Sequence, residues 1–126
     1  MVLDDIAMDI TQVVRGEDIL SSTPRQLLLY RLLGAEPPRY AHFPLVLDAD
    51  GERLAKRHHS LTVEELRGAG VSARAITGYL AWRAGLQDAP RPTLPSELVE
   101  GFAFGRIMRE PVILPADIAD VLARLG

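Results

Sequence analysis

The spacing of apolar positions changes along the chain, and its first part predicts strands joined by a helix. Residues 12–16, QVVRG, and the apolar run 43–47 each predict a β-strand. The run 43–47 has no alternation, which is typical of a strand covered on both faces. Residues 24–33 carry leucines around a wide face, which predicts a helix between the two strands. We expect residues 1–4 to form a further short strand.

Cap and turn residues bound the predicted helix. Ser21 or Ser22 can cap its start, and Pro24 suits its first turn because the missing N–H has no helical partner there. Gly34 can supply the left-handed conformation that ends the helix. A strand, a helix and a strand in this order predict a βαβ unit of an α/β fold. In such folds ligands bind beyond the carboxyl ends of the parallel strands.

The pattern over residues 61–126 predicts helices only. Thr62 and Glu65 have the spacing of a capping box, which starts one helix. Ser72 is expected to start a second helix. Residues 87–96 contain three prolines and are expected to form a linker. Two more short helices are expected, over residues 95–105 and 115–126.

The composition of the 126 residues excludes several kinds of chemistry. The chain has no cysteine, so disulfides, zinc sites with cysteine ligands and thiol nucleophiles are excluded. Its apolar runs are far shorter than the roughly 20 residues that a membrane-spanning helix needs. The amino terminus, MVLDDIAMD, has neither the basic nor the apolar segment of a secretion signal. We therefore expect a cytoplasmic protein that does not enter a membrane.

The charge is unevenly distributed, although the net charge is only −3. Residues 53–91 contain seven basic and three acidic residues, whereas residues 1–20 contain one basic and five acidic residues. The positive middle of the chain can meet the phosphates of a nucleotide or a nucleic acid. Ordinary solvent-exposed arginines explain the same distribution, and on charge alone they are the favoured explanation.

The three histidines, His42, His58 and His59, do not predict a metal site. A metal needs ligands that converge at about 2 Å, and the neighbours His58 and His59 would point apart in a strand or a helix. The chain has no HxxxH or HExxH motif. It also lacks the GxSxG turn that presents the nucleophile of a serine hydrolase.

Two polar segments follow the predicted strands and are expected to share one rim of the fold. In the first, the guanidinium of Arg15 can bind a carboxylate in a bidentate pair, or it can form an ion pair with Asp18 inside the turn. The second is the loop 48–59, whose basic residues can clamp a polyphosphate or remain a solvated turn. The phosphate-binding pattern GxxxxGK[ST] is absent. Residue types alone favour the ordinary explanation in both segments.

Several motifs occur together and in order: VLDD, VVRGED, STPRQ, HFPL and RLAKR. Through them, residues 1–85 closely resemble the glutamyl-tRNA synthetase family of class I aminoacyl-tRNA synthetases, which includes the glutamyl-Q tRNA(Asp) synthetases. The resemblance implies an α/β fold, in which residues 1–60 are the second half of a Rossmann-like nucleotide-binding fold. Residues 61–126 would then form an all-helical region like the stem-contact part of the family. It also implies ATP, L-glutamate and tRNA as substrates, with Mg²⁺ accompanying ATP and no metal held by this chain.

The resemblance implies roles for the basic loop. RLAKR at residues 53–57 resembles KLSKR, the family's form of the KMSKS signature. Lys56 is then the catalytic lysine that stabilises the phosphates of ATP as pyrophosphate departs. Arg53 stands at the first lysine of the motif, which keeps the charge but changes its geometry, and Ala55 lacks the hydroxyl of the motif's serine. Arg57 is expected to assist or to meet tRNA.

Further roles are implied for residues near the ends of the two strands. Arg15 matches the family's arginine that holds the carboxylate of the amino-acid substrate. Leu45 and Val46 match the strand end whose backbone contacts adenine. Asp18 and Ile19 occupy the stretch that lines the ATP and tRNA acceptor side.

The resemblance leaves the state of the whole enzyme open. The family's HIGH signature and the rest of its first half have no counterpart in these 126 residues, so we expect the chain to need a partner that supplies that half or to self-associate. One alternative is a subunit of a split synthetase, and another is a non-catalytic fragment that binds tRNA or a nucleotide. The tail GFAFGRIMREPVILP resembles the end of the glutamyl-Q tRNA(Asp) synthetases, which favours that subgroup.

Overall fold

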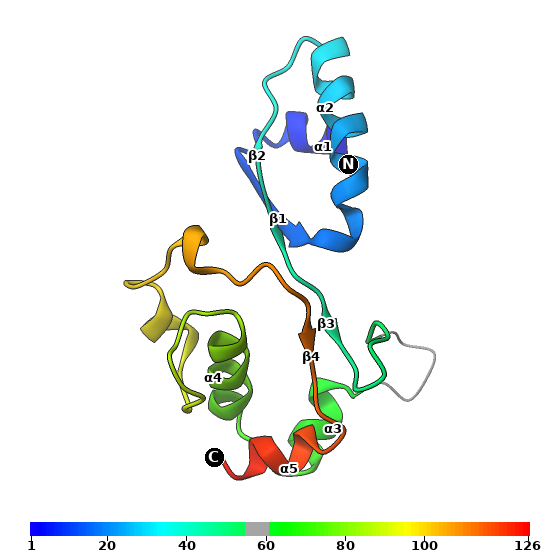
Figure 1. Cartoon of the computed structure of the whole chain (residues 1–126). Helices are drawn as coiled ribbons and strands as arrows, with labels where there is room; N and C mark the ends of the chain where they lie inside the picture. The colour runs from blue at the N-terminus through cyan, green and yellow to red at the C-terminus, as the bar shows by residue number, and fades with distance from the viewer. Residues whose placement is uncertain (55–60) are drawn as a thin grey trace. The chain divides into compact units, whose positions relative to one another are not determined.

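The computed structural model describes residues 1–54 and 61–126. These residues form two compact units, Met1–Leu45 and Val46–Gly126. Each unit contains one pair of parallel strands together with helices, so the fold is mixed α/β (Figure 1). In the described part of the chain, no helix is both long and apolar enough to cross a bilayer.

The first unit contains the predicted strand–helix–strand arrangement. Strands β1 (Gln12–Gly16) and β2 (Arg39–Phe43) pair in parallel. The chain leaves β1 through the 3-10 helix η1 (Glu17–Ser22) and helix α2 (Thr23–Leu32) before it returns along β2 (Figure 1). Gly34 follows the end of α2 with a φ of 67°, the left-handed conformation that glycine adopts without strain. The predicted order of strand, helix and strand is therefore confirmed, although the second strand is Arg39–Phe43 and not the expected 43–47.

The strand expected at residues 1–4 is wrong, because this segment belongs to helix α1 (Val2–Ala7). Val2 is buried while the neighbouring Leu3 is 67% exposed, and four residues are too few to separate a period of two from a helical period. The terminal amino group lies 2.6 Å from the carboxylate of Asp4. That carboxylate is in the first turn of the helix, where the helix dipole favours negative charge.

The apolar run 43–47 does not form one continuous strand. Strand β2 ends at Phe43, and strand β3 (Val46–Leu47) begins after Pro44, which has no N–H to donate to a ladder. All five residues of the run are half-buried. The expectation that both faces are fully covered is therefore wrong as well.

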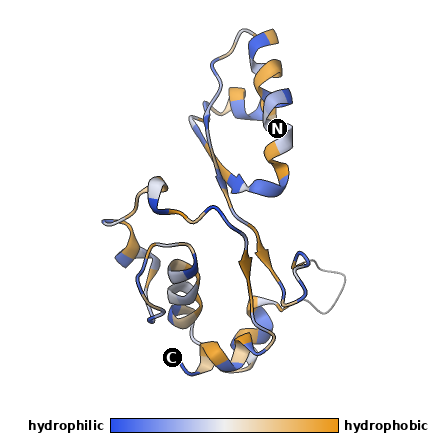
Figure 2. Ribbon diagram, viewed as in Figure 1, coloured by the Kyte–Doolittle hydropathy of each residue, from blue (hydrophilic) through white to orange (hydrophobic). Residues whose placement is uncertain are grey.

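The second unit combines three helices with a second strand pair. Helices α3 (Val63–Gly68), α4 (Ala73–Arg83) and α5 (Ile118–Ala123) are present as predicted. Strand β3 pairs in parallel with β4 (Val112–Ile113), and both strands are hydrophobic (Figure 2). The expectation that residues 61–126 are all-helical is therefore wrong at β4, because a two-residue strand leaves no periodic pattern in the sequence. The buried core consists of Leu66, Val71, Ala75, Tyr79, Val112, Leu114, Ile118 and Leu122.

Helices α3 and α4 begin at the cap residues that the sequence predicts. The hydroxyl of Thr62 accepts from the backbone N–H of Glu65 at 3.1 Å, and the carboxylate of Glu65 accepts from the N–H of Thr62 at 2.8 Å. This is the complete capping box. Ser72 accepts a hydrogen bond from the N–H of Ala75 at 3.1 Å and so caps α4. Gly85, with a φ of 81°, follows the end of α4.

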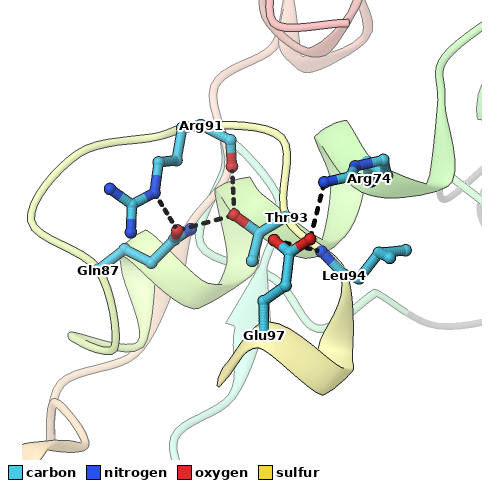
Figure 3. A network of polar contacts seen from close by, with 6 residues as sticks. All are labelled: Arg74, Gln87, Arg91, Thr93, Leu94 and Glu97. Carbon is cyan, nitrogen blue, oxygen red and sulfur yellow. Dashed lines mark hydrogen bonds and ion pairs between the residues drawn. The ribbon is translucent and has the colours of Figure 1, made fainter. Parts of the chain in front are cut away.

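The proline-containing segment 87–96 packs against α4 and is not a free linker. Gln87 and Thr93 are 6% and 3% exposed. The side-chain amide of Gln87 donates to the carbonyl of Gly78 at 2.9 Å, and its oxygen accepts from the hydroxyl of Thr93 at 2.8 Å and from Nε of Arg91 at 2.9 Å (Figure 3). This buried network holds the segment close to the helix, because each buried polar group in it needs its partner.

The helix expected over residues 95–105 is replaced by two short 3-10 helices, η2 (Pro95–Leu98) and η3 (Phe104–Arg106). Arg74 of α4 and Glu97 of η2 form an ion pair at 2.9 Å (Figure 3). Both side chains are about half-exposed, at 49% and 47%, so solvent screening leaves this pair a small share of the stability.

Several apolar side chains of α2 are exposed to solvent. Leu28 and Leu32 lie one helical turn apart and are 53% and 72% exposed. Leu29 and Leu33, at 47% and 50%, continue the same surface. Contiguous exposed apolar side chains favour association with another surface.

We expect Gly78→Ala to lower the free energy of unfolding by about 2–4 kcal/mol, in the range of overpacked core positions. A Cβ atom at Gly78 would lie 1.7 Å from the carbonyl oxygen of Arg91, a backbone atom that cannot move alone. Gly68→Ala is the matched control, because nothing lies within 4 Å of its Cβ position and alanine favours a helix. Urea unfolding monitored by circular dichroism measures both; equal stabilities would contradict the close approach.

We also expect the chain to self-associate at tens of micromolar through the α2 surface, and the double change Leu28→Gln, Leu32→Gln to shift it to monomer. Val63→Gln serves as the control, because Val63 is 61% exposed on a different helix. Sedimentation velocity distinguishes the species. A parent chain that is monomeric at that concentration would contradict self-association through the α2 surface.

Candidate functional site

The register of the first strand pair brings three polar side chains to one face. Arg15 lies opposite His42, and Val13 lies opposite Tyr40. Since side chains two residues apart point to the same face of a strand, Arg15, Tyr40 and His42 share a face. Thr23, the first residue of α2, reaches the same cluster and is 9% exposed.

Hydrogen bonds from Arg15 organise this cluster. Its Nε donates to Nε2 of His42 at 3.1 Å, and its Nη2 donates to the hydroxyl of Thr23 at 2.7 Å. The hydroxyl of Thr23 and Nε2 of His42 are themselves 3.2 Å apart. The sequence left open an ion pair of this arginine within its own turn, whereas these contacts join it to a hydroxyl of α2 and an imidazole of β2.

Aromatic rings complete the surroundings of Arg15. The guanidinium carbon lies 4.8 Å from the centroid of the Tyr40 ring, within the range of a cation–π contact. The rings of Tyr40 and His42 are stacked at 6.2 Å. The arginine is therefore held between a ring and two hydrogen-bond acceptors.

Two buried polar atoms of this cluster have no partner among the described residues. These are Nη1 of Arg15 and the hydroxyl oxygen of Tyr40. A buried donor without an acceptor costs about 1–3 kcal/mol, and such groups in a folded protein call for an explanation. An anionic ligand that accepts from Nη1 would satisfy it.

Burial raises the pKa values of the two tyrosines near the cluster. Burial, and then the negative charge of Asp5, raise the pKa of Tyr30, whose hydroxyl donates to Asp5 at 3.3 Å. Burial raises the pKa of Tyr40 as well, against the opposing effect of the positive charge on Arg15. Because a raised pKa disfavours the phenolate, both hydroxyls remain hydrogen-bond donors at neutral pH.

The turn after β1 is joined to the end of the first unit. A carboxylate oxygen of Glu17 accepts from the backbone N–H of Leu45 at 3.4 Å. A Cβ atom on Gly16 would lie 2.6 Å from a carboxylate oxygen of Asp18, so the turn admits only glycine there without rearrangement. Ile19, the next residue, is 39% exposed. The structure therefore gathers Asp18 and Leu45 around Gly16, directly after Arg15.

The start of the predicted phosphate loop is an ordered turn in the second unit. The carboxylate of Asp48 accepts from the N–H groups of Asp50 and Glu52 at 3.0 and 2.8 Å, and Gly51 turns the chain with a φ of 79°. Leu47 then forms an antiparallel bridge with Arg53. This geometry is a tight turn stabilised by an aspartate. The turn brings Arg53 beside Leu47 of strand β3.

Lys56 and Arg57, with Ala55, His58 and His59, lie outside the described residues. Val46 begins β3 and pairs with β4. In the parts of the chain that the structure describes, no group of three or more histidine, cysteine, aspartate or glutamate side chains could hold a metal ion.

The sequence does not predict that Thr23, Tyr40 and His42 lie around Arg15. His42 belongs to the HFPL motif and is one of the three histidines, and Thr23 belongs to the STPRQ motif. The available signal was the spacing of Tyr40 and His42, which places both on one face of β2. Their meeting with Arg15 depends on the register between strands, which the sequence does not state.

Comparison with known proteins identifies the family. Residues 1–96 match the family described as tRNA synthetases class I (E and Q), catalytic domain. The chain belongs to this family of class I aminoacyl-tRNA synthetases, a family of ligases, as the motifs predicted.

Curated relatives include glutamyl-Q tRNA(Asp) synthetases. The chain is 56% identical to the one from Nitratidesulfovibrio vulgaris and 49% identical to the one from Symbiobacterium thermophilum, in each case over 98% of the chain and 38% of the relative. Glutamate–tRNA ligase 1 of Rhodospirillum rubrum is 44% identical over 98% of the chain and 28% of the relative. The chain thus spans less than two-fifths of the length of these relatives.

A solved structure supports the fold. A glutamate tRNA ligase from Elizabethkingia meningosepticum, determined in complex with its amino acid, superposes with a TM-score of 0.74 at 24% sequence identity. The match covers 96% of this chain and 28% of that one. The mixed α/β arrangement with parallel strands is thus similar to part of a glutamate–tRNA ligase.

We expect Thr23→Val to lower the free energy of unfolding by about 1–3 kcal/mol, because it leaves an N–H of the Arg15 guanidinium buried without an acceptor. Thr23→Ser keeps the hydroxyl and removes one methyl group, so its effect should stay below about 1 kcal/mol. Urea unfolding of both variants measures the difference. If valine is tolerated as well as serine, the contact at 2.7 Å does not stabilise the fold.

Proposed function

We propose that this chain supplies part of a glutamate-activating site, in which ATP and L-glutamate form glutamyl-adenylate and the glutamyl group passes to tRNA. The observation that carries the proposal is the identity of 56% and 49%, over 98% of the chain, with two glutamyl-Q tRNA(Asp) synthetases. In the first step a glutamate carboxylate oxygen attacks the α-phosphorus of ATP and pyrophosphate leaves. In the second step a hydroxyl group of the tRNA attacks the glutamyl carbonyl and AMP leaves.

Arg15 is the proposed glutamate-binding residue. Its unpartnered Nη1 supports this role, since a guanidinium can donate two parallel hydrogen bonds to a carboxylate. The low exposure of the surrounding Thr23 and the neighbouring rings strengthen such a contact, because water competes less there. Catalysis of this kind consists mainly of positioning and of stabilising charge.

The remaining residues are assigned to ATP and tRNA. Lys56 stabilises the phosphates as pyrophosphate departs, and Arg53 assists it. Arg57 contacts tRNA. The backbone of Leu45 and Val46 contacts adenine; the present hydrogen bond of the Leu45 N–H to Glu17 is long, at 3.4 Å, and therefore weak enough to be exchanged.

The turn that follows Arg15 is assigned to the same substrates. Asp18 and Ile19 line the ATP and tRNA acceptor side in this proposal. The exposed position of Ile19 supports it, because 39% of its surface is available to a ligand.

Mg²⁺ enters the proposal as part of the substrate. It commonly binds nucleotide phosphates and keeps several waters, with few protein ligands. In this proposal the metal therefore arrives with ATP.

The product is assigned to the glutamyl-Q class. The glutamyl-Q tRNA(Asp) synthetases among the relatives reach 56% identity, whereas the glutamate–tRNA ligase of R. rubrum reaches 44%. Transfer of labelled glutamate to tRNA(Asp) with and without queuosine tests this assignment. If tRNA(Glu) is labelled as well as tRNA(Asp) that contains queuosine, the chain is assigned to the glutamate–tRNA ligases instead.

The nucleotide-binding fold is proposed to be shared with further protein. The chain spans 38% of the relatives' length, so the second half of the Rossmann-like fold would be completed by the remaining part, supplied by a partner or by association. If the chain and that part together show no glutamate-dependent ATP–pyrophosphate exchange while both are folded, a module that binds tRNA or nucleotide without catalysis replaces the enzyme.

We expect Lys56→Ala to lower glutamate-dependent ATP–pyrophosphate exchange by about 10²–10³-fold, the usual effect of removing one group that stabilises transition-state charge. The assay combines the chain with the part of the N. vulgaris relative that it does not cover. Arg109→Ala, which removes an exposed arginine outside the assigned site, is the matched control. Glutamate affinity should change less than about threefold, because the lysine acts on phosphate. Equal exchange rates for Lys56→Ala and the parent would remove the assignment.

A further inference from the structure

The guanidinium of Arg15 is held along one edge only. An arginine has five N–H groups in a fixed planar fork. Nε and one N–H of Nη2 donate to His42 and Thr23, and these two acceptors lie 3.2 Å apart. The opposite end of the fork, with Nη1, has no partner among the described residues although it is buried.

We propose that His42 is a positioning residue: its imidazole, together with Thr23, fixes the Nε and Nη2 edge of the Arg15 guanidinium and so sets the orientation in which this arginine meets the carboxylate of the bound amino acid. The inference rests on the proposed function, since it assigns to His42 the orientation of the glutamate-binding arginine. Fixing a rotamer-rich side chain before the ligand arrives favours binding, because less conformational freedom is lost on binding.

The hydrogen-bond pattern determines the tautomer of His42. Nε2 accepts from Nε of Arg15, a group that can only donate, so the ring proton belongs on Nδ1. The hydroxyl of Thr23 accepts from Nη2 of Arg15 and lies 3.2 Å from Nε2 of His42. A protonated His42 would lose this acceptor and would place a second positive charge against Arg15.

Two substitutions of His42 separate positioning from packing. His42→Gln keeps an uncharged acceptor at about the reach of Nε2, whereas His42→Phe keeps a ring that can stack on Tyr40 and removes the acceptor. Circular dichroism and urea unfolding first establish that both variants fold. Should His42→Phe fail to fold, Thr23→Val and Thr23→Ser provide the same comparison at the second acceptor.

The test uses the 126-residue chain combined with the part of the N. vulgaris relative that it does not cover, and L-glutamate is the probe. Long-range ¹H–¹⁵N spectra of the imidazole read the tautomer of His42, and the Nε–H signal of Arg15 is followed during titration with L-glutamate. Sodium chloride at the same ionic strength is the control for nonspecific effects.

The expected result has two parts. The imidazole of His42 carries its proton on Nδ1. His42→Phe weakens glutamate binding about tenfold, the effect of one hydrogen bond to a charged group, whereas His42→Gln stays within about threefold of the parent.

Two other outcomes would contradict the positioning role of His42, and only the second would also contradict the glutamate-binding role of Arg15. A proton on Nε2, or equal glutamate affinity in the phenylalanine and parent chains, overturns the positioning role and leaves the glutamate-binding arginine in place. If the tautomer is as expected but glutamate shifts the Arg15 signal no more than sodium chloride does, the proposed glutamate-binding role of Arg15 falls, and the positioning role falls with it.

Discussion

The parallel pairing of β1 with β2 is the constraint on which the candidate site depends. Its register sets Arg15 opposite His42 and Val13 opposite Tyr40, and the alternation of side chains then puts the polar groups on one face. A shift of one residue would move every side chain of the strand to the other face. The connection through α2 adds Thr23, so the surroundings of Arg15 come from two strands and the helix between them.

Among the described residues, the guanidinium of Arg15 contacts an imidazole, a hydroxyl and an aromatic face. The imidazole and the hydroxyl accept its hydrogen bonds, and the ring attracts the cation through its face. These partners belong to β2 and α2, so the position of this side chain depends on the packing of both elements.

The second unit is organised differently, by close packing around α4. The carbonyl of Gly78 accepts from Gln87, and the Arg91 carbonyl occupies the place where a Cβ would stand. A segment that contains three prolines forms few backbone ladders, so the side chains of Gln87 and Thr93 provide its anchoring. The apolar core that includes Tyr79 and Leu122 lies among the helices and β4.

The sequence alone determined the features that depend on local chemistry. The capping box of Thr62 and Glu65, the turn at Gly34, the βαβ order and the family could all be predicted, because each depends on residue types at short spacing. Tertiary structure decided the rest. Residues 1–4 became a helix and Val112–Ile113 a strand because segments this short carry no decisive period and take their state from their contacts. The partnership of Arg15 with His42 joins residues 27 apart in the chain, and only the register of paired strands brings such residues together.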